Sequence, residues 1–133
     1  MDAFQADYER ISNCLTAATG IKPLYYRFPG GSTEVTEKLQ MTDLDAYFNA
    51  QGASYFDWNV IAANNTTDDV SVNKMVDSVM NGVALYDTSI VLMYDSVDRK
   101  MTAKSLDSIL DYLLKNGYEI LPIDENTIPI HHS

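Results

Sequence analysis

The feature that most constrains this fold is the alternation of amphipathic helical patterns with short apolar segments. Apolar residues recur at three- and four-residue steps over residues 2–19, 42–51, 72–83 and 102–115, which predicts helices there. Short apolar runs predict strands over residues 24–28, 53–60, 89–93 and 118–123. The alternation indicates an α/β fold with parallel strands and right-handed crossovers. About four strands would make half of a closed eight-stranded barrel or a small open sheet.

Glycine and proline mark the ends of these elements. Gly20, Gly52 and Gly117 follow helical patterns as stops, and Pro23 prevents the first helix from continuing. A tight Pro-Gly-Gly turn is expected at residues 29–31, directly after the first strand. In α/β folds such loops after strands commonly carry function.

We predict a single domain over residues 1–133 with a loose tail over 124–133, because no repeat or linker divides the pattern. Nineteen acidic residues against nine basic ones give a net charge of −10, which disfavours nucleic acid and anionic membranes as partners. No apolar stretch is long enough for a membrane span, and the first residues show no export signal, so the localisation stays open. The lone Cys14 excludes an intrachain disulfide and is expected to be a buried thiol.

Three motifs bear on function. They are Arg-Phe-Pro-Gly-Gly at residues 27–31, Phe-Asp-Trp-Asn-Val at 56–60 and Ile-Val-Leu-Met-Tyr-Asp at 90–95. Taken alone, the first motif is equally a strand-to-helix turn with an exposed arginine. In this order and spacing, the three resemble the later motifs of the polysaccharide deacetylase family. Its members are metal-dependent enzymes that remove acetyl groups from chitin, peptidoglycan or xylan.

This resemblance implies a partial distorted (β/α) barrel that corresponds to the C-terminal part of a family member. In the family a divalent metal, usually zinc, polarises the acetyl carbonyl and activates water. An aspartate and two histidines from the early part of the chain hold it. The resemblance implies that Arg27 orients the catalytic base, and that Pro29 and Gly30 shape the groove beside it. It further implies that Trp58 walls the groove and that Leu92 lines the acetyl pocket.

Two positions depart from the family's pattern. Tyr94 stands where the family has the histidine that protonates the leaving amine, and an unperturbed tyrosine has a pKa of about 10 instead of about 6.5. Loss of a well-matched general acid typically costs about a hundred- to ten-thousandfold in rate. Asn64 stands where the family has the aspartate that supports this histidine, and an amide carries no charge for that role.

The chain offers few metal ligands. Its two histidines, His131 and His132, are adjacent in the predicted tail and would point to opposite sides of an extended chain, so they make a poor chelating pair. Asp57, Asp87 and Asp95 fit no ligand spacing and are expected to be solvated loop acids. The family's early aspartates and paired histidines have no counterpart. We therefore predict no metal site and no cofactor in this chain.

Three functions remain open from the sequence. In the first, the chain is a part of a polysaccharide deacetylase that is inactive alone, with Arg27 and Tyr94 at its catalytic positions. Alternatively, the groove around Arg27, Trp58 and Tyr94 binds a glycan without hydrolysing it, as in a regulatory pseudoenzyme. In a third possibility, a second copy or a separate N-terminal half completes the barrel, because half a barrel exposes strand edges and apolar surface. A polysaccharide is the expected partner in the first two cases, and self-association is expected in the third.

Overall fold

The computed structural model describes residues 1–35, 39–62, 70–95 and 100–132. The chain divides into two compact units, residues 1–57 with 127–133 and residues 58–126. Each unit combines helices with one pair of parallel strands. The predicted α/β class with parallel strands is therefore confirmed, and each unit is described by itself below.

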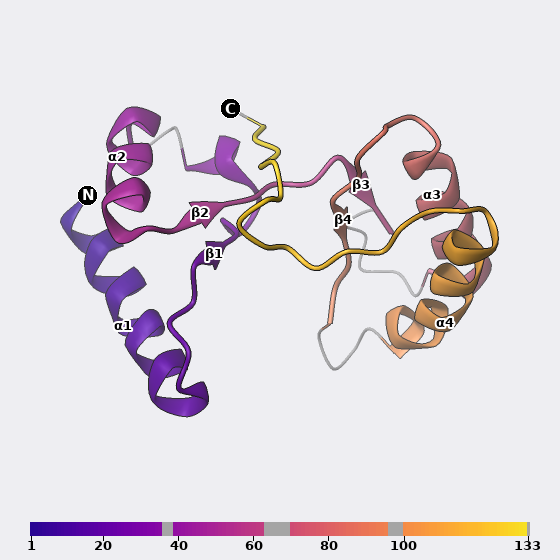
Figure 1. Ribbon diagram of the computed structural model, residues 1–133, viewed down its shortest axis with the longest axis horizontal. Helices are drawn as coiled ribbons and strands as arrows, with labels where there is room; N and C mark the ends of the chain where they lie inside the picture. The colour runs from indigo at the N-terminus through magenta and orange to yellow at the C-terminus, as the bar shows by residue number, and fades with distance from the viewer. Residues whose placement is uncertain (36–38, 63–69, 96–99, 133) are drawn as a thin grey trace. The chain divides into compact units, whose positions relative to one another are not determined.

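The first unit places two helices against a short parallel strand pair (Figure 1). Strand β1 pairs with β2 so that Tyr25 lies opposite Ser54 and Tyr26 opposite Tyr55. The ladder continues past both ends, since the N–H of Ser54 donates to the carbonyl of Leu24 and the N–H of Phe56 donates to the carbonyl of Tyr26, both at 2.8 Å. The elements in chain order are α1 Asp2–Thr19, β1 Tyr25–Tyr26, the 3₁₀ turn η1 Ser32–Glu34, α2 Met41–Gln51 and β2 Ser54–Tyr55.

The core of the first unit is aromatic. Ring centroids of Tyr26 and Phe28 lie 5.1 Å apart in an edge-to-face arrangement, and those of Phe28 and Tyr55 lie 5.2 Å apart. Such geometry is favoured because a positive ring edge meets a negative ring face. The buried members are Tyr8, Phe28, Leu44, Phe48, Ala53 and Tyr55. Because Tyr26 and Phe28 face this core, strand alternation turns Arg27, between them, to the opposite face.

Helix α1 ends at Gly20, as predicted, with a left-handed φ of 76°. Its buried residues are Tyr8 and Ser12. Cys14 is exposed, so the prediction of a buried thiol is wrong. The reason is the helical period: two residues beyond Ser12 is a rotation of about 200°, which carries the thiol to the opposite side of the helix.

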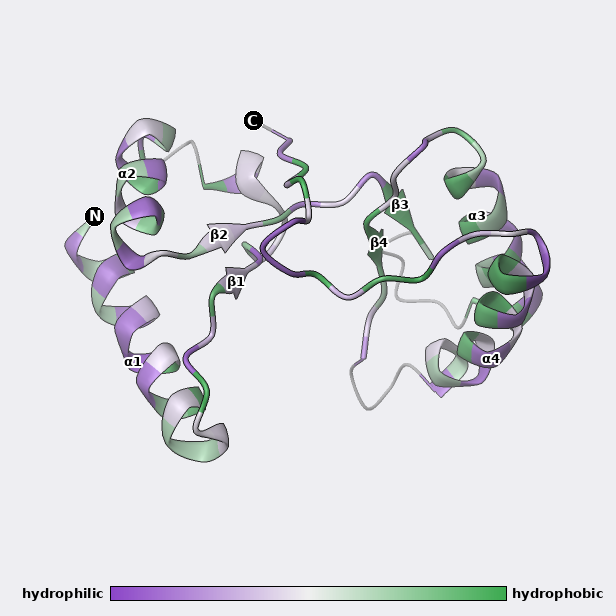
Figure 2. Ribbon diagram, viewed as in Figure 1, coloured by the Kyte–Doolittle hydropathy of each residue, from purple (hydrophilic) through white to green (hydrophobic). Residues whose placement is uncertain are grey.

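The second unit packs two helices against the strand pair β3–β4. Val60 lies opposite Val91 and Ile61 opposite Leu92. Figure 2 shows β3 and β4 in the green of hydrophobic residues, whereas β1 and β2 are pale. The elements are β3 Val60–Ile61, α3 Val72–Val83, β4 Val91–Leu92 and α4 Lys100–Lys115, and the buried core is Val60, Ala62, Val79, Val83 and Ile109.

Polar bonds fix the helices of the second unit in place. The hydroxyl of Ser78 on α3 donates to the carbonyl of Ile61 at 2.8 Å. The buried Ser105 on α4 lies 3.4 Å from the sulfur of Met75 on α3. Among the described residues, no helix combines the length and apolar character needed to cross a membrane.

The predicted strand over residues 53–60 is two strands in the structure, because the chain changes its pairing partner. Phe56 still donates to Tyr26 of the β1 segment at 2.8 Å, whereas Asn59 donates to Ile90 of the β4 segment at 3.2 Å. The side chain of Asn59 holds the new partner as well, accepting from the N–H of Ile90 at 2.8 Å. An asparagine in an apolar run thus marks a crossing point between strand pairs.

Both chain segments after α4 differ from their predictions. Residues 118–123 form no strand, since no described strand pairs with them, and they expose apolar side chains such as Leu121, which is 69% exposed. At the predicted loose tail, the carbonyl of Ile130 accepts from the N–H of Asp57 at 2.7 Å, and the N–H of His132 donates to the carboxylate of Asp57 at 2.7 Å. The last residues are therefore hydrogen-bonded to the first unit.

Helix starts also differ. The helix predicted over residues 42–51 begins at Met41, and the helix predicted over 102–115 begins at Lys100. Serine, threonine and aspartate are also tolerated inside the first turn of a helix, so their presence fixes a helix start to within a few residues.

Candidate functional site

The turn after β1 folds around the carbonyl of Phe28. That oxygen accepts from the N–H of Gly31 at 2.9 Å and from the Nη1 atom of Arg27 at 3.3 Å. Gly30 and Gly31 have φ values of 79° and 93°, which residues with a Cβ rarely adopt. The sequence prediction of a glycine turn beside Arg27 is confirmed, and the turn is tied to the arginine side chain itself.

A buried carboxylate holds the other end of this turn. Asp57 is 1% exposed and Ser32 is 0% exposed. The Oδ1 atom of Asp57 accepts from the N–H of Ser32 at 2.9 Å, and its Oδ2 atom accepts from the Ser32 hydroxyl at 2.5 Å and from the N–H of His132 at 2.7 Å. The prediction that Asp57 is a solvated loop acid is therefore wrong.

These hydrogen bonds set the charge state of Asp57. Burial alone would raise its pKa, but the bonds from Ser32 and from the backbone of His132, with the nearby His132 side chain, outweigh burial and lower the pKa of Asp57 below its ordinary value. The carboxylate is therefore ionised at neutral pH. It accepts hydrogen bonds from three donors and so joins η1, the end of β2 and the C-terminal residues.

The two histidines occupy different surroundings in the first unit. The ring of His131 stacks on that of Tyr55, with centroids 4.0 Å apart, and its Nε2 atom lies 3.1 Å from the Tyr55 carbonyl oxygen. His132 reaches Asp57 through its backbone N–H. Both side chains are exposed.

In the second unit, Leu92 lies on β4 between two residues that pack against the helices. Val91 and Met93 contact the apolar core, so alternation turns Leu92 to the face away from α3 and α4. Its carbonyl accepts from the N–H of Ala62 at 3.0 Å. Tyr94, two residues further on, and Trp58 are both partly exposed.

The predicted site residues fall into two sets. Arg27, Pro29 and Gly30 lie together in the first unit, whereas Trp58, Leu92 and Tyr94 belong to the second. The assignment of Asn64 lies outside the described residues. Asp87 and Asp95 are exposed.

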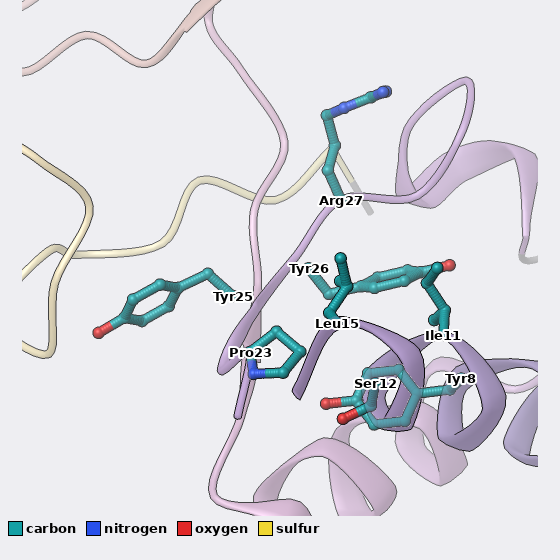
Figure 3. Close-up of a pocket in the computed structure, with 8 residues that line it drawn as sticks. All are labelled: Tyr8, Ile11, Ser12, Leu15, Pro23, Tyr25, Tyr26 and Arg27. Carbon is teal, nitrogen blue, oxygen red and sulfur yellow. The ribbon is translucent and has the colours of Figure 1, made fainter. Parts of the chain in front are cut away.

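A pocket of about 190 Å³ opens beside α1 in the first unit. In Figure 3 the guanidinium of Arg27 points away from the other labelled side chains of this pocket. No carboxylate or imidazole lines it, so the pocket suits apolar contact and not acid–base chemistry. Its lining residues are Tyr8, Ile11, Ser12, Leu15, Pro23, Tyr25, Tyr26 and Arg27.

The described residues do not fit the zinc site that the family resemblance implies. Across residues 1–35, 39–62, 70–95 and 100–132, no three His, Cys, Asp or Glu side chains converge to hold a metal ion. Zinc sites need three or four such ligands at about 2 Å. Both carboxylate oxygens of Asp57 already accept hydrogen bonds from Ser32 and His132.

Two solved structures are similar in fold to this chain. The chain is similar to the catalytic domain of a peptidoglycan N-acetylglucosamine deacetylase from Eubacterium rectale, with a TM-score of 0.86 and 28% identity over 99% of this chain and 61% of that chain. It is also similar in fold to a CE4 esterase from Streptococcus mutans, with a TM-score of 0.70 and 24% identity over 84% of this chain and 49% of that chain.

These similarities confirm the resemblance to the polysaccharide deacetylase family over part of a family member's length. This chain spans less than two thirds of either solved chain. No protein-family model and no curated protein sequence matches it.

Sequence reasoning missed Asp57 and Ser32. The signal was present, because Asp57 interrupts the aromatic and apolar run of residues 53–60, where a charged side chain is costly unless it is paired. The partners of Asp57 are 25 and 75 residues away in sequence, so no local pattern identifies them.

Proposed function

We propose that this chain is the groove-forming part of a polysaccharide deacetylase-like barrel, and that it binds N-acetylated glycan of the peptidoglycan or chitin type without hydrolysing it by itself. The observation that carries the proposal is the similarity, over 99% of the chain, to a catalytic domain named for peptidoglycan N-acetylglucosamine deacetylation. A fold alone does not fix function, which depends on the residues of the site.

The strand faces support the placement of these residues. Arg27 lies on the face of β1 away from the aromatic core, and Leu92 lies on the face of β4 away from α3 and α4. In a (β/α) barrel the helices are outside, so within each unit the strand face away from the helices is the one expected to carry ligand contacts. Under the proposal, Arg27 supplies charged hydrogen bonds to the glycan and Leu92 contacts the acetyl methyl group.

Aromatic walls suit sugars because the faces of sugar rings carry C–H groups. Trp58 is partly exposed and follows directly on the Asp57 anchor. Under the proposal Trp58 stacks against one sugar ring, and in the first unit Pro29 and Gly30 shape the surface beside Arg27. Trp58 is the chain's one tryptophan, so its emission is an unambiguous probe of binding.

Two features of the chain argue against hydrolysis by the chain alone. Its histidines are His131 and His132, one stacked on Tyr55 and the other bonded to Asp57 through its backbone, and these positions make no chelating pair. The family resemblance implies a histidine as the general acid at the position where this chain has Tyr94.

Association is a second candidate, favoured by exposed apolar side chains. In the first unit Ile21 is 73% exposed, and Ile11 and Leu15 border the pocket at 47% and 42%. In the second unit Leu114 is 61% exposed and Leu121 is 69% exposed. Under this proposal, a second copy or a complementary half covers these surfaces. A monomer at high dilution that binds no hydrophobic dye would rule it out.

The glycan proposal is tested by titrating the chain with N-acetylglucosamine oligomers while the emission of Trp58 is recorded. We expect a saturable change in the millimolar range, which Arg27→Ala weakens and which the de-N-acetylated oligomers do not produce. Arg10→Ala is the matched control, since Arg10 is an exposed arginine on α1 paired with Asp7. Unchanged emission with every oligomer would refute binding. Acetate release by the zinc-supplemented chain would refute the absence of hydrolysis.

A further inference from the structure

We propose that Asp57 is a positioning residue for Arg27, acting through Ser32 and the glycine turn, and that the C-terminal residues 130–132 form part of this arrangement. The inference rests on the proposed glycan function and deepens it, because it assigns a groove role to a carboxylate and to a terminal segment. It extends the site from the arginine motif to two segments distant in sequence.

The first step is a continuous set of bonds from Asp57 to Arg27. Asp57 accepts both donors of Ser32, and Ser32 follows Gly31 directly. The N–H of Gly31 donates to the carbonyl of Phe28 at 2.9 Å, and the guanidinium of Arg27 donates to the same oxygen at 3.3 Å. The position of that carbonyl, and so of the guanidinium, depends on where Ser32 is held.

The second step is that the glycines cannot hold the turn alone. Residues with φ values of 79° and 93° have a wide choice of backbone angles, which makes the turn pliable without an anchor. On the near side, Phe28 is 2% exposed in the aromatic core and is fixed by packing. On the far side, the buried bonds between Ser32 and Asp57 supply the matching anchor.

The third step concerns the C-terminal segment. The N–H of Asp57 donates to Ile130, and the carboxylate of Asp57 accepts from His132, so residues 130–132 bracket the aspartate on its backbone and its side chain. The stacking of His131 on Tyr55 adds a third contact to the same segment. The segment thus limits the movement of Asp57 and closes it off from solvent.

Only a carboxylate at position 57 can accept all three of these hydrogen bonds. Its two oxygens face two backbone N–H donors and one hydroxyl. In Asp57→Asn, whichever way the amide is turned, its NH₂ group faces a backbone N–H, which leaves at least one donor unpaired. Ser32→Ala removes the hydroxyl bond but keeps both backbone bonds. The graded expectation is that Asp57→Asn disturbs the turn more than Ser32→Ala does.

Two substitutions at His132 test whether the C-terminal segment helps to position Asp57. His132→Pro removes the N–H that donates to Asp57, whereas His132→Ala keeps it and removes the imidazole. Asp87→Asn is the matched control for the aspartate, because Asp87 is exposed. Loss of a bond to a buried charged group is expected to weaken glycan binding roughly tenfold.

The experiment combines NMR of the Arg27 side chain with glycan titration of each variant. We expect Asp57→Asn and His132→Pro to shift the Nε–H resonance of Arg27 and the amide of Ser32, and to weaken glycan binding roughly tenfold. Asp87→Asn should leave both measurements unchanged, and His132→Ala, which keeps the N–H bond to Asp57, should change them less than His132→Pro does. In the intact chain, the Ser32 and His132 amides should titrate together at acid pH, which a merely structural contact elsewhere would not produce.

The outcomes separate this inference from the glycan proposal. If the intact chain binds no glycan, the proposed function fails, and the Arg27 resonance alone still decides whether Asp57 positions it. If Asp57→Asn and His132→Pro are folded and the Arg27 resonance stays in place, the positioning role is overturned. An altered resonance with unchanged glycan affinity overturns the role in binding. If Asp57→Asn fails to fold, the Arg27 resonance in Ser32→Ala and His132→Pro tests the positioning role instead.

Discussion

The imidazole ring of His131 lies on the ring of Tyr55, with the two planes 12° from parallel. Tyr55 is 3% exposed. Burial raises the pKa of Tyr55 to about 12, and the charge of Asp45, its hydrogen bond to the phenol and the charge of Asp57 act in the same direction. The phenol is therefore held neutral in the folded chain.

A raised tyrosine pKa predicts a loss of stability in alkali. Unfolded chains release the proton near pH 10, whereas folded Tyr55 keeps it to about 12. Its contribution is fully present below pH 10 and is lost as the pH rises through 12, by roughly 2–3 kcal/mol in total. The measurement is urea unfolding between pH 9 and 12.

Tyr55→Phe should flatten that alkaline dependence, with Tyr86→Phe as the control because Tyr86 is 47% exposed. Equal slopes for the intact chain and Tyr55→Phe would contradict the assignment. Three other tyrosines, Tyr8, Tyr26 and Tyr47, have raised pKa values through burial, so part of the slope should remain.

The lowered pKa of Asp57 predicts a loss of stability in acid. Its folded pKa is lowered, because the bonds from Ser32 and His132 outweigh the effect of burial. Its stabilisation is therefore present above the unfolded pKa of about 3.9 and is lost as the pH falls through the lower folded value. Asp57→Asn should reduce stability at neutral pH by about 1–3 kcal/mol and show a weaker fall below pH 4. Chemical unfolding at pH 7 and pH 3 checks this, and a parallel fall in both chains would contradict it.

How far the sequence predicts this fold depends on how local each signal is. The period of apolar residues and Gly20 predicted α1 over Asp2–Thr19, and the αL conformation of Gly52 ends α2 as predicted. These signals act within a few residues. The exposed Cys14 shows their limit, since an apolar stripe leaves the rotation of the helix uncertain by about one residue, or 100°.

Features that depend on distant partners were not predictable in the same way. The division of residues 53–60 into two strands arises where Asn59 takes a new partner 31 residues further along the chain. The burial of Asp57 depends on Ser32 and His132, and no described strand pairs with residues 118–123. For the candidate site, the sequence identified the Arg27 turn but not the carboxylate that holds it.

The glycine turn gives a matched pair of substitutions. Gly30 and Gly20 have similar φ values, 79° and 76°. A Cβ at Gly30 would lie 2.7 Å from the Cγ atom of Glu34, whereas a Cβ at Gly20 meets nothing within 4 Å. Both alanine variants should lose about 1–2 kcal/mol of stability from backbone strain. Gly30→Ala should also displace Glu34 and weaken glycan binding, while Gly20→Ala should not. Equal glycan affinities for the two variants would contradict a role for the turn.

The contact between Gly82 and Val60 sets how closely α3 approaches β3. A Cβ at Gly82 would lie 2.6 Å from Cγ1 and 3.1 Å from Cγ2 of Val60, a side chain that is 4% exposed and stiff at χ1. In an open helix, alanine in place of glycine stabilises by about 1 kcal/mol. Here overpacking should reverse the sign, so Gly82→Ala is expected to destabilise the chain by about 1–3 kcal/mol in urea unfolding.

A double-mutant cycle separates the contact from helix propensity. Val60→Ala removes both γ-carbons, so Gly82→Ala should be tolerated or stabilising in that background, with a coupling of about 1–3 kcal/mol. Asn81→Ala on the exposed side of α3 is the control for propensity and should stabilise slightly. If Gly82→Ala were as favourable as Asn81→Ala in the unaltered chain, the close packing of α3 on β3 would be wrong. The β3–β4 pair would then lack the support from α3 that this packing gives it.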